Sequence, residues 1–211
     1  MFSLKKGDLK TDEEDKALQE NVVTYTQYDD IVDFAEDHAF NTDQDTFINK
    51  EMKDLISVPE EWSNLFNAIN HLRVMNKFHP DFLFENLEFI ATFCKESCQN
   101  LRSNISKNGL MLTNEMFKNK EAMQSEKYKD SITKFLHVVL PAVFARTVYD
   151  KVFIAKEAKN AVAQCMTNFV SPDTLTIIMN EGCKNRINNK TLTEISYTSF
   201  MKDLVSSADF K

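Results

Sequence analysis

The sequence has few of the residues that make tight turns, with three glycines and four prolines in 211 residues. β-Sandwiches and barrels need special backbone angles at their hairpins, so this scarcity argues against both. No apolar run approaches the roughly 18 residues of a membrane span, and the charged start MFSLKKGDLKTDEED lacks a signal-peptide core. We therefore expect an intracellular, soluble protein made of helices joined by short loops.

Motifs of catalysis and metal binding are also missing. The sequence contains no Gly-rich phosphate loop, no HExxH motif and no nucleophile elbow. The cysteines at 94, 98, 165 and 183 have no histidine at zinc-finger spacing, so we interpret them as reduced core or boundary residues. We expect no enzymatic activity, no cofactor and no metal site.

The net charge of −7 is concentrated near the N-terminus. Residues 1–46 hold four lysines and thirteen acidic residues, a balance of −9, which leaves +2 for residues 47–211. A domain at +2 lacks the basic footprint that nucleic-acid binding requires. We expect an acidic, partly disordered extension over residues 1–46 and a folded domain over 47–211. The stretch TYTQYDDIVDFAEDHAF either docks on the domain or on a partner as a short helix, or stays solvated.

Apolar residues recur at helical spacing through most of the remaining chain. The pattern predicts helices over 47–56, 59–76, 80–100, 103–117, 125–149, 150–169, 172–182 and 190–205. Pro59 suits a first helical turn, and Ser103 and Ser171 suit N-caps. Gly182 suits a helix stop, and Pro141 predicts a kink inside its helix.

Helices beginning near residues 60, 103, 150 and 190 define an internal repeat. Its length, about 40 to 47 residues, is the period of HEAT and armadillo arrays. In such arrays each helical pair buries its inner face only against its neighbours. The predicted fold is therefore all-α, an α-solenoid of HEAT/armadillo-type helical hairpins.

Three stretches in register, within residues 58–182, resemble a known family. They are EEWSNLFNAINHLRVMNKFHPDFL, NLRSNISKNGLMLTNEMF and VFIAKEAKNAVAQCMTNFVSP. They are similar to successive repeats of the TOG domain, the HEAT-repeat module that binds tubulin through the loops inside its repeats. The likeness is greatest to the crescerin group of TOG-array regulators of axonemal microtubules, with CLASP-type domains next. Because the chain has fewer repeats than a complete TOG domain, the resemblance implies a shortened TOG-like domain.

The resemblance also implies a binding site. By position, Trp62 matches the apolar anchor of the first loop, although a tryptophan there could instead close the array against the helix at 47–56. The implied tubulin-binding residues are Trp62, Asn100, Arg102, Ser103, Asp150, Lys151, Lys184, Asn185, Arg186 and Lys190. Basic side chains on this edge would complement the acidic surface of tubulin.

These features lead to two functional hypotheses. The resemblance implies a non-enzymatic structural protein of the cytoskeleton, in the cytoplasm and the axoneme of the cilium or flagellum, that binds tubulin or microtubules. Its other partners would be axonemal or cytoskeletal proteins, one of them covering the C-terminal helix, without nucleic acid or membrane. The alternative is a HEAT-like scaffold or adaptor without tubulin affinity.

Overall fold

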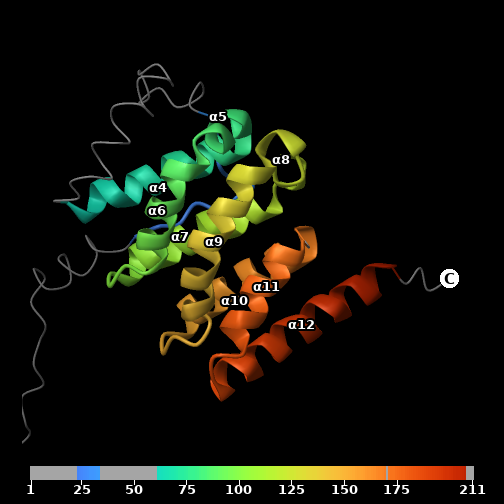
Figure 1. Ribbon diagram of the computed structural model, residues 1–211. Coiled ribbons are helices and arrows are strands. Elements are labelled where there is room, and N and C mark those ends of the chain that lie inside the picture. The colour runs from blue at the N-terminus through green and yellow to red at the C-terminus, as the bar shows by residue number, and fades with distance from the viewer. Residues whose placement is uncertain (1–22, 34–60, 170, 208–211) are drawn as a thin grey trace, which may run out of the picture.

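The computed structural model describes residues 23–33, 61–169 and 171–207, and within them it contains helices and no strand (Figure 1). The all-α prediction is confirmed, whereas the helix expected over 47–56 lies outside the described residues. The helices are α4 (Trp62–Phe78), α5 (Pro80–Glu85), α6 (Leu87–Cys98), α7 (Ser103–Lys118), α8 (Lys120–Met123), the 3-10 helix η2 (Glu126–Tyr128), α9 (Lys129–Arg146), α10 (Val152–Asn168), α11 (Pro172–Gly182) and α12 (Arg186–Ser207).

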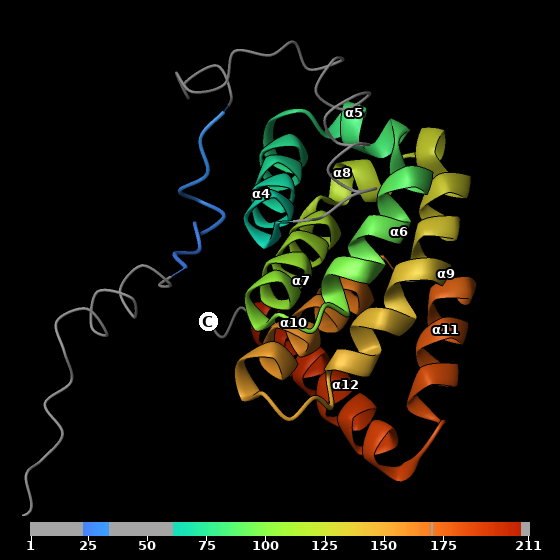
Figure 2. The same ribbon diagram turned by 90° about the vertical axis from the view of Figure 1, so that its left-hand side faces the viewer.

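The helices form two layers (Figure 2). In one layer α4 packs on α7, α7 on α10 and α10 on α12; in the other α6 packs on α9 and α9 on α11. Consecutive helices α6 and α7, α9 and α10, and α11 and α12 pair across the two layers. The loops inside these pairs therefore precede α7, α10 and α12.

Leucine, isoleucine and phenylalanine side chains fill the core between the layers. The rings of Phe117 on α7 and Phe135 on α9 meet edge to face with centroids 6.5 Å apart. The largest fully buried apolar side chains include Phe84, Phe93, Phe117, Phe135 and Phe144. Of the cysteines, Cys94, Cys98 and Cys165 are buried in this core and Cys183 is exposed, in line with core and boundary positions.

The start of α4 and the course of the following segment differ from the prediction. Glu61 is an extended N-cap (φ −118°, ψ 126°), so α4 begins at Trp62, and the predicted first-turn residue Pro59 lies outside the described residues. The single helix expected over 80–100 is interrupted at Asn86, whose backbone leaves the helical region (φ −106°, ψ 16°). Its side-chain amide donates to the Phe82 carbonyl at 2.9 Å, a local bond that competes with helix continuation.

One of the two predicted serine caps is confirmed. Ser171 Oγ accepts from the Thr174 backbone N–H at 3.1 Å and caps α11. The expected Ser103 cap is wrong, because Arg102 is the N-cap of α7 and Ser103 is its first helical residue. Asn100 Oδ1 accepts from the Arg102 N–H at 2.9 Å, and this bond stabilises the preceding turn.

The helix predicted over 172–182 has the predicted bounds, whereas other boundaries differ by a few residues. Gly182 is the last residue of α11 with an ordinary negative φ; a Cβ at this position would collide with the side chain of Leu192, so close packing explains the glycine. Pro141 lies inside α9, which follows the 3-10 turn η2. The helix α10 begins at Val152, later than the predicted residue 150, and α12 begins at Arg186, earlier than the predicted residue 190.

Residues 23–33 form an extended strap with one turn, docked on the outer face of α4 and α7 (Figure 2). Of the two alternatives for this stretch, docking on the domain is confirmed within these residues, but the docked segment is extended and the expected short helix is wrong. Ile31 is buried, and the Tyr25 ring meets Phe66 edge to face at 5.8 Å. Tyr25 Oη donates to Asn104 Oδ1 at 3.0 Å, so the N-terminal end of the strap lies beside the start of α7.

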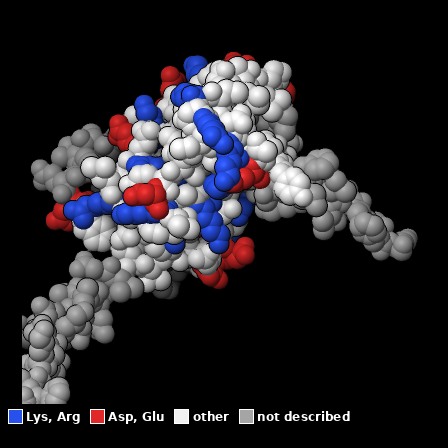
Figure 3. All heavy atoms as spheres, turned by 90° about the horizontal axis from the view of Figure 1, so that it is seen from below, with Lys and Arg blue, Asp and Glu red and all other residues white. Residues whose placement is uncertain are grey.

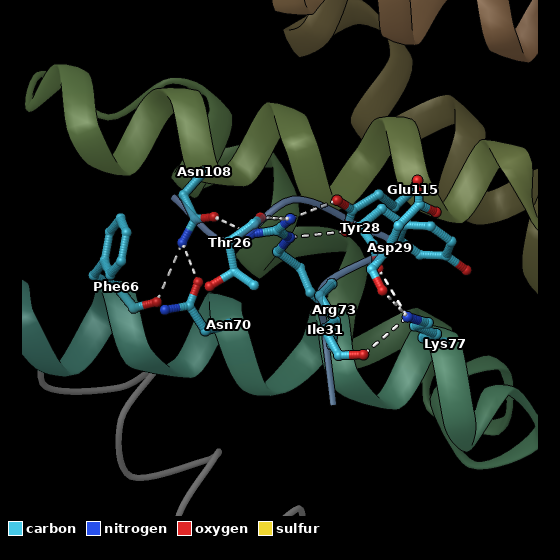
Figure 4. A network of polar contacts seen from close by, with 10 residues as sticks. All are labelled: Thr26, Tyr28, Asp29, Ile31, Phe66, Asn70, Arg73, Lys77, Asn108 and Glu115. Carbon is cyan, nitrogen blue, oxygen red and sulfur yellow. Dashed lines mark hydrogen bonds and ion pairs between the residues drawn. The ribbon is translucent and has the colours of Figure 1, made fainter. Parts of the chain in front are cut away.

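Two cations of α4 bind the strap through its main chain (Figure 4). Lys77 Nζ donates to the carbonyls of Tyr28, Asp29 and Ile31 at 3.0, 3.0 and 2.8 Å. Arg73 Nη2 donates to the Thr26 carbonyl at 2.7 Å. Because carbonyls are common to all residues, this recognition depends on an extended shape more than on side-chain identity.

Candidate functional site

The loops that precede α7, α10 and α12 lie beside one another, together with the start of α4. We call this surface, residues 61–62, 99–103, 147–152 and 183–187, the loop edge. The Arg102 guanidinium lies 5.9 Å from the Trp62 ring centroid, which joins the first two segments. Lys151 Nζ donates to Ser103 Oγ at 2.5 Å, and Val148 lines a shallow pocket with residues 185–188. Predicted residues from all four segments therefore share one edge.

Trp62 is partly exposed, with 36% of its surface accessible within the described structure. It lines a shallow pocket with Leu101, Arg102 and Ser103. A cation stacked on a tryptophan ring restrains both side chains while leaving the outer ring face open to a partner. The alternative contact of Trp62 with residues 47–56 falls outside the described residues.

The second loop is held by Arg146, a residue that the sequence did not point to. Arg146 is 9% exposed at the end of α9, and its Nε donates to the Cys98 carbonyl at 2.9 Å. Its Nη2 donates to the Asn100 carbonyl at 3.3 Å, and its guanidinium lies 4.4 Å from the Tyr149 ring centroid. A cation in the apolar run that forms α9 was the available signal. Arg146 positions the second and third loops relative to each other.

Some of the predicted residues have local structural contacts. Asn185 Oδ1 accepts from the Asn188 N–H at 2.9 Å, the bond of an N-terminal turn. Lys184 pairs with Glu181 at 2.6 Å. Lys190 is 80% exposed, with its Nζ 3.9 Å from Glu194 Oε1. Asp150, Lys151 and Arg186 are exposed at the surface.

Exposed apolar side chains were missed by the sequence analysis. Leu101 is 89% exposed, Val152 81%, Ile187 66% and Val148 39%. All four lie in or beside the loops of the loop edge, whose positions depend on the packing of the helices. With Trp62 they form an apolar series between basic residues, a composition typical of protein contact surfaces.

The electrostatics of the loop edge are mainly positive. Figure 3 looks at the side of the molecule where α10 and α12 begin and shows a band of Lys and Arg side chains with fewer acidic groups among them. The cations of the edge are Arg102, Lys151, Lys184 and Arg186, and Lys190 lies next to them; the carboxylates within the edge are Glu61 and Asp150. Such a surface complements an acidic partner with apolar anchors.

The described ranges offer neither a metal-binding cluster nor a membrane-spanning helix. No group of three or more His, Cys, Asp or Glu residues in these ranges is arranged to hold a metal ion. No helix in the part of the chain that the structure describes is long and apolar enough to cross a membrane.

No protein-family model, curated protein or solved structure matches the chain.

Proposed function

We propose that this chain is a non-enzymatic structural protein that binds tubulin or microtubules through the loop edge, as a component of the ciliary axoneme. The supporting observation is that the segments matched by the TOG resemblance meet on one edge, with Trp62 partly exposed beside Arg102. Both the tubulin partner and the ciliary location come from the resemblance. The chemistry of the edge, basic with apolar anchors, suits the acidic surface of tubulin.

The proposal gives distinct roles to the residues of the edge. Trp62 supplies a large apolar contact at small entropic cost, the property that makes tryptophan common among binding hot spots. Arg102 keeps the ring oriented, since it lies over one face of it. The exposed lysines and arginines speed and orient the encounter with an acidic partner, an effect that salt weakens.

Titration of the full chain against soluble tubulin at low and physiological salt tests the role of Trp62. Trp62→Ala is expected to cost about 2 kcal/mol or more, a loss of roughly 30-fold in affinity. The matched control is Phe78→Ala, because Phe78 is an equally exposed aromatic residue, at 38%, near the opposite end of α4. Equal losses in both variants, or no loss in either, would overturn the proposal.

Charge is tested with a second pair of variants. Arg102→Glu is expected to weaken binding at low salt more than at high salt, because screening reduces the repulsion. Lys134→Glu changes an exposed charge on α9, in the other layer, and is expected to have little effect. A similar salt response in both variants would point to non-specific attraction.

The alternative function is a scaffold or adaptor without tubulin affinity. The docked strap favours it, because the strap demonstrates that the outer face of this layer accommodates an extended segment (Figure 4). In that case a folded, helical chain shows no binding to tubulin. Trp62→Ala then changes only the stability of the fold.

A further inference from the structure

A second groove lies in the same layer as the strap, between α10 and α12. The side of α10 contributes Val152, Lys156 and Lys159, and the side of α12 contributes Ile187, Lys190 and Glu194. These residues recur at spacings of three and four, so each set forms one stripe along its helix. The groove extends to Val148 and Tyr149 at the loop edge.

The groove between α4 and α7 shows what the face of this layer can bind. There the strap lies extended, with Tyr25 packed against Phe66 and Ile31 buried. Lys77 and Arg73 hold its main chain through four carbonyls. The strap is itself acidic, because VTYTQYDDIVD contains three aspartates and no basic residue.

The groove between α10 and α12 offers the same combination of groups. Its apolar surface is exposed, since Val152 is 81% and Ile187 66% accessible. Its three lysines outnumber its one carboxylate, Glu194, which pairs with Lys159 at 3.0 Å. Lys156 is exposed and forms no ion pair with any residue that the structure describes.

We propose that the groove between α10 and α12 is a docking site for an extended acidic segment of a partner protein that carries one apolar side chain. The apolar side chain packs between Val152 and Ile187, and the flanking carboxylates pair with Lys156 and Lys190. The occupied groove of the same layer and the charge of the lysines support this partner. The groove shares Val148, Val152 and Ile187 with the loop edge, but it extends along α10 and α12 to Lys159 and Glu194, and neither Trp62 nor Arg102 lines it.

The probe is a fluorescein-labelled peptide with four glutamates on each side of one phenylalanine, titrated with the full chain and followed by anisotropy. We expect binding that weakens with salt, and at least about a fivefold loss in Lys156→Glu, since reversal turns an attraction into a repulsion. Ile187→Ser is expected to weaken binding by a similar factor, because it removes part of the apolar contact with the phenylalanine of the peptide. The control is Lys134→Glu, an exposed lysine of the other layer.

Three results would overturn the proposal. One is equal binding of a peptide with glutamine in place of glutamate, and another is an equal loss in Lys134→Glu. The third is concentration-dependent dimerisation in light scattering that Lys156→Glu abolishes, because the occupant would then be a second copy of this chain. Trp62→Ala is expected to leave peptide binding unchanged, so failure of the groove and failure of the tubulin contact are separable.

Discussion

The buried ion pair beneath the strap makes a sharp prediction about stability. Arg73 and Glu115 face each other between α4 and α7, with side chains 1% and 4% exposed. Arg73 donates from Nε and Nη2 to the two carboxylate oxygens at 2.8 and 2.6 Å. Its remaining contacts are Asn108 Oδ1 at 3.3 Å and the Thr26 carbonyl of the strap. Removal of Arg73 therefore affects both the helix pair and the strap.

The expected magnitude follows from the burial of Glu115. In Arg73→Met the carboxylate loses its counter-charge in a dry site, which typically costs about 3 to 5 kcal/mol. In Arg73→Met/Glu115→Met both charges are gone, and replacement of a buried pair by apolar groups is often nearly neutral. The double variant then lacks mainly the bond to the Thr26 carbonyl, worth about 1 kcal/mol. The single variant should thus be the less stable of the two.

Urea unfolding of the full chain, followed by circular dichroism at 25 °C, measures these differences. For a chain of this size each kcal/mol corresponds to about 2 to 4 °C in Tm, so Arg73→Met should melt roughly 6 to 20 °C below the wild type. The reasoning is refuted if the double variant is as unstable as the single one. It is equally refuted if Arg73→Met is nearly neutral at pH 8.

The same pair gives a pH dependence with a definite sign. Burial raises the pKa of Glu115, and the hydrogen bonds and charge of Arg73 oppose that rise. Without Arg73 the native pKa rises further above the unfolded one, so native Glu115 binds its proton more tightly than unfolded Glu115 does. The free energy of unfolding of the Arg73→Met variant should therefore fall as pH rises from 5 to 8. Glu115→Gln has no titrating group there and serves as the control.

Two further predictions concern packing and the thiols. Gly109→Ala should destabilise the chain, because the new Cβ would lie 2.8 Å from Ser97 Cβ on α6. This clash opposes the intrinsic preference for alanine over glycine in helices, about 1 kcal/mol. A higher Tm for the variant would contradict the close approach of α6 and α7. Of the four thiols, only exposed Cys183 should react rapidly with a disulfide reagent at pH 8, and all four should react in urea. Burial raises the pKa of Cys98 and Cys165 to about 12 and that of Cys94 well above its ordinary value. The native thiols therefore stay protonated at a pH where the unfolded thiols ionise. The free energy of unfolding should fall as pH rises from about 9 toward 12.

The fold was largely predictable because helical periodicity reports which faces are buried. The paired helices and most of their boundaries follow from apolar spacing, and the Ser171 cap follows from local chemistry. The interruption at Asn86 was not predicted, because the apolar pattern continues through it. Arg102 replaced Ser103 as the N-cap because Asn100 fixes the turn, a choice between neighbours that composition alone does not decide.

The candidate site was predictable only in outline. The resemblance to the TOG domain placed Trp62, Arg102 and Lys151 in loops of one edge, and the structure brings these loops together. The exposure of Leu101 in a loop and of Ile187 in the first turn of α12 was missed, because the sequence alone does not show whether an apolar residue near a helix end is buried. Their exposure depends on how neighbouring helices end, which is a tertiary property.

The strap illustrates a different limit on inference from composition. Its sequence suggested either docking as a short helix, because aromatic residues and Ile31 offer apolar contacts, or a solvated extension, because the N-terminal region is rich in acidic residues. In the structure, Lys77 and Arg73 satisfy strap carbonyls, and Ile31 and Tyr25 supply the apolar contacts. Recognition through carbonyls leaves no sequence motif in the bound segment. A partner of the groove between α10 and α12 would then be identified by its charge and extended shape, and a search for a fixed consensus would miss it.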